Sequence, residues 1–203
     1  MSSPESRLVT AARRFSHAIA EGDGISVVAA VEDADAARAA EAQRAEALVV
    51  DGEPAGLRAA TSLPILWRAN ATVARAAELA DAVTVTLPDA DEDHESAQRR
   101  HEDALAAGLD CAVEVRSEEE LERALELLDP EILLLAPPPG APDERLEAVL
   151  DLLAEVPAGK LAIADLVVTT EDEVHELERA GVDAVIVHAA DVSPLAGEAP
   201  PEV

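Results

Sequence analysis

The stretch 108–125, GLDCAVEVRSEEELERAL, runs from an alternating apolar pattern straight into a charged helical pattern. Its first part, LDCAVEV, predicts a short strand that ends next to Glu114. In its second part Glu120 stands three places after Ser117, which is the spacing of a helix capping box, and apolar residues follow at helical spacing. A strand that passes directly into a helix is the repeating unit of an α/β fold.

The same alternation continues along the whole chain. Eight short runs have strand character, at 25–31, 47–50, 64–67, 81–87, 109–115, 131–136, 160–165 and 183–188. Segments rich in Ala, Leu, Glu and Arg separate them and have helical periodicity. This alternation predicts parallel strands joined by crossover helices, and eight units close a (β/α)8 TIM barrel rather than an open sheet.

The predicted barrel is pared down. The chain has 203 residues, whereas such barrels typically have about 250. The loops after the first two strands are short, and the fifteen residues after His188, AADVSPLAGEAPPEV, are too rich in Pro and small residues for a full helix. We therefore expect one domain over 1–191 that includes an N-terminal helix, a reduced or missing eighth helix, and a flexible C-terminal tail over 192–203.

A missing eighth helix would leave the apolar outer face of the last strand uncovered, at a cost of about 25 cal/mol per Å². Two elements could cover it. One is the helical pattern RLVTAARRFSHAIA at 7–20. The other is a second subunit, so a homodimer is a hypothesis.

The composition limits the partners. Asp and Glu number 43 against 15 Lys and Arg, for a formal net charge of -28. This charge argues against nucleic acid and against an anionic membrane as partners. Lys160 is the single lysine. An excess of acidic residues with almost no lysine fits a halophilic protein in concentrated salt, but a GC-rich genome would also favour Arg and Ala, and both explanations stay open.

The remaining composition predicts a cytoplasmic protein. Cys111 is the only cysteine, so neither an intrachain disulfide nor a cysteine zinc site can form. No stretch has the pattern of a signal peptide or of a membrane-spanning helix. The histidines at 17, 94, 101 and 175 lie in helical or polar stretches and are predicted to be surface groups.

Four segments carry a resemblance to a known family. The stretch GLDCAVEVRSEEELERAL is similar to the fifth strand and helix of indole-3-glycerol phosphate synthase. FSHAIAEGDGISVVAAV, SLPILWRAN and IADLVVTTEDEVHELERAGVDAVIV match other units in the right order, from Phe15 to about Val187. The resemblance implies a ring closure of an anthranilate-type substrate with loss of carbon dioxide and water. It also implies a lysine acid and carboxylates at the C-terminal ends of the strands.

The proton donors of that reaction are absent here. Where the family has Glu and then Lys after the first strand, this chain has Ala30 and Glu32. Where the family has Arg-Lys-Asp-Phe after the third strand, this chain has WRAN at 67–70. Arg68 keeps a positive charge, but a guanidinium does not release a proton near neutral pH. Lys160 begins the seventh strand, which places it at the opposite end of the barrel.

The phosphate site that the resemblance implies is also altered. The family's Glu-Ser-Gly after the seventh strand corresponds to Asp165, Leu166 and Val167, and its glycine after the eighth strand corresponds to His188. Bulky side chains keep an anion away from the backbone amides that would bind it. Of the catalytic residues that the resemblance implies, Glu114 alone remains.

Two functions from different classes follow. The first is a non-catalytic paralogue that has lost the family reaction and acts as a scaffold, for example for an authentic biosynthetic enzyme. The second is a carbon-carbon lyase or isomerase on a small anionic metabolite, with Glu114 and Asp165 as catalytic acid and base. The candidate ligand-binding residues are Arg68, Arg116, Glu32, Asp51 and His188.

A structural role for the same carboxylate is the competing prediction. Glu114 would then pair with Arg68 or Arg116 and stabilise the rim of the barrel. The carboxylates and the histidine lack a recognisable ligand spacing, so neither a metal nor a cofactor is predicted.

Overall fold

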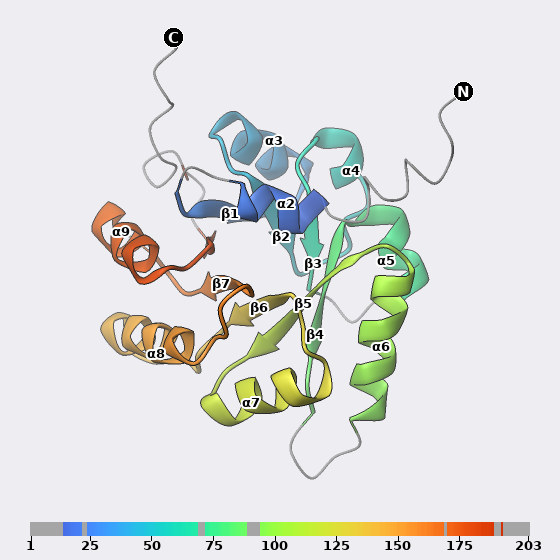
Figure 1. Cartoon of the computed structure of the whole chain (residues 1–203). Coiled ribbons are helices and arrows are strands. Elements are labelled where there is room, and N and C mark those ends of the chain that lie inside the picture. Colours follow the sequence, from blue (N-terminus) through green and yellow to red (C-terminus); the bar gives the residue numbers. More distant parts are fainter. Residues whose placement is uncertain are drawn as a thin grey trace.

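The eight predicted strands all form and close into a parallel barrel in chain order (Figure 1). The computed structural model describes residues 14–21, 24–68, 72–88, 94–168, 170–188 and 192. The strands are β1 (Ser26–Ala30), β2 (Ala47–Val50), β3 (Ile65–Trp67), β4 (Ala82–Thr86), β5 (Asp110–Val115), β6 (Ile132–Leu135), β7 (Leu161–Asp165) and β8 (Ala184–Val187). Since β8 pairs with β1, the sheet has no free edge. The (β/α)8 barrel prediction is confirmed.

Helices connect successive strands and form an arc around the barrel (Figure 1). They are α3 (Ala34–Ala42), α4 (Leu57–Ala60), α5 (Val73–Leu79), α6 (Glu95–Ala106), α7 (Glu118–Leu127), α8 (Pro142–Ala154) and α9 (Glu171–Ala180), and α2 (Arg14–Ala20) precedes β1. Asp33, Thr72, Ser117 and Thr170 cap their helices with side-chain oxygens, which satisfies amide groups that have no partner within the helix. After β8 only His188 and Val192 are described, so the reduced or missing eighth helix stays a prediction.

Alternating side chains of each strand divide the core into two parts. One set points into the barrel and includes Val28, Leu66, Leu134 and Ile186. The other set points outward against the helices. The same alternation orients the candidate site residues. Each lies two positions after an inward-facing residue of its strand, so each side chain is on the inward side: Arg68, Glu114, Asp165 and His188.

Helix α2 closes the N-terminal end of the barrel. Phe15 and Ile19 are buried and belong to the cluster that fills the barrel interior. The backbone N–H of Ser16 donates to Asp110 at the start of β5, at 2.7 Å. The alternative in which this helix covers the outer face of the last strand is therefore wrong for residues 14–20, because their apolar side chains fill the end of the barrel. Residues 7–13 lie outside the described part.

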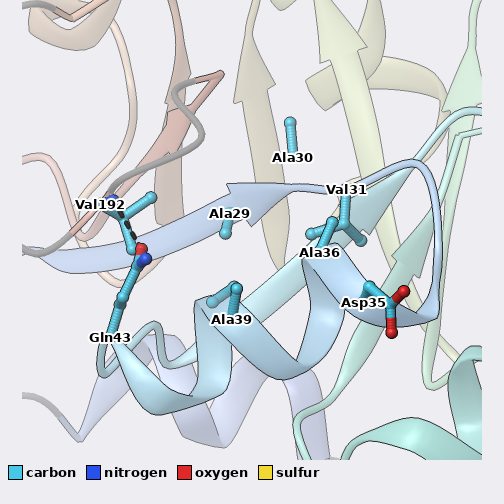
Figure 2. Close-up of a pocket in the computed structure, with 9 residues that line it drawn as sticks. Ala29, Ala30, Val31, Asp35, Ala36, Ala39, Gln43 and Val192 are labelled. Atoms are coloured by element: carbon cyan, nitrogen blue, oxygen red, sulfur yellow. Dashed lines mark hydrogen bonds between the residues drawn. The ribbon is translucent and has the colours of Figure 1, made fainter.

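Beside β1, the outer surface has an apolar hollow of about 290 Å³. Figure 2 shows Ala29 of β1 on one side of it, α3 residues on the other, and Val31, which directly follows β1, beside Ala36. Val192 is buried there, and its N–H donates to the Gln43 side-chain oxygen at 2.8 Å. The rest of the predicted tail, 193–203, lies outside the described residues.

Carboxylates placed just before strands explain part of the acidic composition. Glu46 accepts the N–H of Val27 at 2.8 Å, and Asp183 accepts the N–H of Ala162 at 2.7 Å. Each carboxylate thus satisfies a donor at the start of the neighbouring strand, where the ladder has no partner for it. Burial raises the pKa of both carboxyl groups, although these hydrogen bonds act in the opposite direction.

One predicted surface group is inside. His101 of α6 is 8% exposed, so its prediction as a surface residue is wrong. It lies on the helix face that packs against the barrel, next to Ala97 and Ala104 in helical spacing. Burial lowers its pKa, which favours the neutral imidazole. The described helices include none that is long and apolar enough to cross a bilayer.

Candidate functional site

The C-terminal ends of the strands bring three of the predicted residues together. Arg68 directly follows β3, Asp165 is the last residue of β7, and His188 directly follows β8. This end of a parallel barrel is the end at which activity is found in the fold. We call these three residues the mouth cluster.

An ion pair crosses the barrel mouth. A terminal nitrogen of Arg68 lies 2.7 Å from Asp165 Oδ2, and the side chains are 19% and 11% exposed. Three strands separate β3 from β7 in either direction around the closed barrel, so the two residues face each other across it. The Arg68 Nε also lies 3.5 Å from Asp51, but that carboxylate is 80% exposed and screened by water.

Asp165 has further partners on both its side chain and its backbone. Its Oδ1 lies 2.9 Å from Nε2 of His188, and its backbone carbonyl accepts a hydrogen bond from Arg145 of α8 at 2.9 Å. Burial alone would raise the pKa of Asp165, but the hydrogen bond from His188 and the charge of Arg68 outweigh burial and hold the pKa below its usual range. Asp165 is therefore an ionised carboxylate at neutral pH.

Glu114 has a different partner. Its Oε1 accepts hydrogen bonds from Nε and a terminal nitrogen of Arg116, at 3.0 and 2.9 Å. Of the two expected pairings of Glu114, the structure thus has the one with Arg116. Two hydrogen bonds from one guanidinium hold the carboxylate in a fixed orientation.

The capping pattern after β5 differs in one detail from its prediction. The Ser117 hydroxyl accepts the N–H of Glu120 at 3.3 Å, as a capping box requires. The Glu120 carboxylate, however, accepts the N–H of Arg116 at 2.9 Å, one residue before the cap. This contact fixes the backbone that carries the Arg116 side chain.

Glu32 is exposed in the turn after β1. The carboxylate next to it, Asp33, caps α3 by accepting two backbone N–H groups. Across the described ranges, no three His, Cys, Asp or Glu side chains lie close enough together to hold a metal ion.

Two polar groups in or near the mouth were not among the predicted site residues. Arg145 reaches from α8 to the Asp165 carbonyl. Thr84 is 6% exposed on β4, and its hydroxyl has no hydrogen-bond partner in the described part of the chain. The alternation in AVTVT marks Thr84 as inward-facing, but nothing local in α8 marks Arg145.

The arrangement pairs the charged groups with one another. Arg68 is bound to Asp165, and Arg116 is bound to Glu114. Lys160 lies at the start of β7, at the other end of the barrel, where it pairs with Asp129 and donates to its carbonyl at 3.2 Å. The mouth therefore has fixed carboxylates and guanidinium groups, an imidazole that is 39% exposed, and no lysine of this chain.

Fold and site together define a (β/α)8 barrel with a polar cluster at the C-terminal ends of its strands. No family model matches the chain. The chain is related in sequence to indole-3-glycerol phosphate synthases over nearly half of its length. Over 98 residues it is 37% identical to those of Variovorax paradoxus (strain S110) and Polaromonas naphthalenivorans (strain CJ2). Each match covers 47% of this chain and 37% of the relative, so it spans little more than a third of these enzymes.

A solved structure supports the fold. The N-acetylmannosamine-6-phosphate 2-epimerase from Clostridium perfringens superposes with a TM-score of 0.65, over 83% of this chain and 88% of that one. The two sequences are 15% identical, so this likeness concerns the barrel fold alone.

Proposed function

We propose that this chain is a barrel related to indole-3-glycerol phosphate synthase that does not carry out the ring-closing decarboxylation and acts as a scaffold. The relationship in sequence supports the ancestry. A ring closure with loss of water needs a positioned proton donor, and the relatives' lysine positions hold other residues here. Arg68 stands at one of those positions, and a guanidinium group does not act as a proton donor near neutral pH.

The observation that carries the proposal is the ion pair between Arg68 and Asp165. It joins opposite sides of the barrel mouth with both side chains largely buried. A substrate would have to break this pair in order to reach the residues below it. Separating a largely buried ion pair is costly because each charge loses its partner.

Thermal unfolding with added ligand tests this proposal. A ligand that binds only the folded protein raises the unfolding temperature by mass action. We expect the anthranilate-derived substrate of the relatives to give no shift, since the proton donor and the phosphate site have both changed. A concentration-dependent shift with that substrate would argue for a retained active site.

The scaffold part of the proposal has its own test. The purified chain is mixed with an authentic indole-3-glycerol phosphate synthase, and the mass of the mixture is measured by light scattering. We expect a stable complex, and two separate species would remove this enzyme as the partner. The same measurement on the chain alone tests the homodimer, which stays a prediction, as does the cytoplasmic location.

A specific contact favours a second candidate function, a lyase or isomerase reaction on a small anionic metabolite. His188 donates to a buried carboxylate that Arg68 also binds. Carboxylate–histidine pairs at strand ends are a common means of positioning an imidazole for proton transfer. Screening the chain against small carboxylates and phosphate esters for turnover tests this candidate, and loss of any turnover in Glu114→Gln would assign a role to Glu114.

A further inference from the structure

We propose that His188 and Asp165 form an acid–base pair at the barrel mouth, in which His188 exchanges a proton with a small anionic ligand. This inference rests on the second candidate function and names its proton-transferring group. It gives Asp165 a positioning role and leaves Glu114 outside the proton transfer.

The contact between the two side chains defines the state of the imidazole. The distance from His188 Nε2 to Asp165 Oδ1 is 2.9 Å. An ionised carboxylate can only accept a hydrogen bond, so Nε2 must carry the hydrogen. In the neutral imidazole the lone pair then lies on Nδ1, which is the atom that can take a proton from a ligand.

The difference in burial separates the roles of the two residues. The Asp165 side chain is 11% exposed, whereas the His188 side chain is 39% exposed. Asp165 is also held from two other elements, by Arg68 after β3 and by Arg145 of α8. Arg68 fixes the carboxylate and Arg145 fixes the backbone that carries it, so Asp165 can hold the imidazole in one orientation. The imidazole itself is partly exposed to solvent.

The charges around Asp165 indicate the class of ligand. The guanidinium groups of Arg68 and Arg145 both contact this one residue. Asp51 offsets Arg68 only weakly, because it is 80% exposed at 3.5 Å. The ionised Asp165 carboxylate neutralises Arg68, whereas Arg145 contacts only the backbone carbonyl and keeps its charge. In a chain with a net charge of -28, this remaining positive charge beside His188 is a local site where a small carboxylate or phosphate ester can bind.

The reactivity of His188 can be measured with p-nitrophenyl acetate. The lone pair on the imidazole attacks the ester carbonyl carbon, and the carbon–oxygen bond to p-nitrophenolate breaks, which leaves an acyl-imidazolium. Water then hydrolyses the acyl-imidazolium to acetate and two protons and restores the neutral imidazole. The rate is followed for the wild type, His188→Gln and Asp165→Asn. His17→Gln is the matched control, because His17 also contacts a carboxylate, Glu21 at 3.0 Å, but both groups are largely exposed.

We expect His188→Gln to lower the rate at least about tenfold and His17→Gln to leave it unchanged. Asp165→Asn should lower the rate, since an amide, which can also donate, no longer fixes the imidazole in one tautomer and orientation. Inorganic phosphate should slow the wild type by occupying the mouth. Equal rates for the wild type and a folded His188→Gln would overturn the acid–base pair, and indifference to phosphate would overturn the class of ligand.

Nitrogen NMR of the wild type tests the tautomer of His188 and does not depend on whether any variant folds. The imidazole of His188 should show the tautomer with hydrogen on Nε2, and the opposite tautomer would contradict the proposal. Assaying ring closure on the same sample separates the outcomes. If His188 is unreactive and no ring closure is detected, only the acid–base pair is contradicted. If ring closure is detected, the proposed loss of the family reaction is contradicted.

Discussion

Arg68 differs from the residue that the resemblance implies at its position, and it also forms the ion pair across the barrel mouth. It stands where the resemblance places a lysine-containing segment, and in the structure its guanidinium spans the barrel to Asp165. The sequence was sufficient to place Arg68, Asp165 and His188 at the same end of the barrel, because strand ends determine it. It could not predict which carboxylate Arg68 would bind, since that depends on the packing of opposite strands.

Removing Arg68 should destabilise the protein. In Arg68→Ala, Asp165 stays largely buried without its ion-pair partner, and we expect the free energy of unfolding to fall by about 3 kcal/mol. Urea unfolding followed by circular dichroism measures this. Arg75→Ala is the matched control, because Arg75 pairs with Glu53 and Glu78 on the surface, and its loss should cost clearly less than the loss of Arg68. Equal losses of unfolding free energy in the two variants would show that the pair across the mouth stabilises the protein no more than a surface ion pair does.

The lowered pKa of Asp165 predicts a pH dependence of stability. A carboxyl group whose pKa is lower in the folded state stabilises the fold above its ordinary pKa. That contribution is lost as the pH falls through the lowered value. Free energies of unfolding, measured between about pH 2 and pH 7, should therefore drop less steeply in acid for Asp165→Asn than for the wild type. Parallel curves for the two proteins would contradict the assignment.

Helix α2 shows what periodicity can and cannot predict. The pattern around FSHAIA correctly predicted a helix, and the strand patterns correctly predicted all eight strands, because each depends on local sequence. Of the two candidates for covering the last strand, residues 14–20 of this helix are excluded, because Phe15 and Ile19 belong to the interior cluster. A helix with few large apolar side chains fits either an outer face or a barrel end, and only the closed barrel shows that Phe15 fills the end.

Shortening Phe15 should therefore affect the whole barrel. Phe15 is fully buried in the interior cluster, so Phe15→Ala leaves a cavity, and the free energy of unfolding should fall by about 3–5 kcal/mol. Ile19→Val is the milder comparison at the same end, with an expected loss of about 1 kcal/mol. Chemical unfolding measures both. A loss below about 1 kcal/mol for Phe15→Ala would mean that α2 is only loosely attached.

The net charge of -28 affects the molecule as a whole. Some of the carboxylates have local roles at strand starts, as Glu46 and Asp183 do. The net charge nevertheless leaves a large excess of like charge, which opposes the compact state. The sequence was sufficient to predict this repulsion, because it depends on composition and hardly on fold.

Salt should consequently stabilise the protein. Screening shortens from about 10 Å at 0.1 M to about 3 Å at 1 M salt, so repulsion between surface carboxylates weakens over this range. We expect the urea midpoint to rise with potassium chloride. The loss caused by Arg68→Ala should change less with salt, because that pair is largely buried. A midpoint that is independent of salt would show that the acidic surface does not limit stability.

We propose that this barrel does not catalyse the ring closure of the synthases that it resembles. The most direct measurement is the formation of indole-3-glycerol phosphate by the purified chain from the anthranilate-derived substrate, separated chromatographically and compared with an authentic synthase. We expect no product above the uncatalysed background, because the chain has no lysine at the mouth and Arg68 is bound to Asp165. Catalysed formation of indole-3-glycerol phosphate would contradict it.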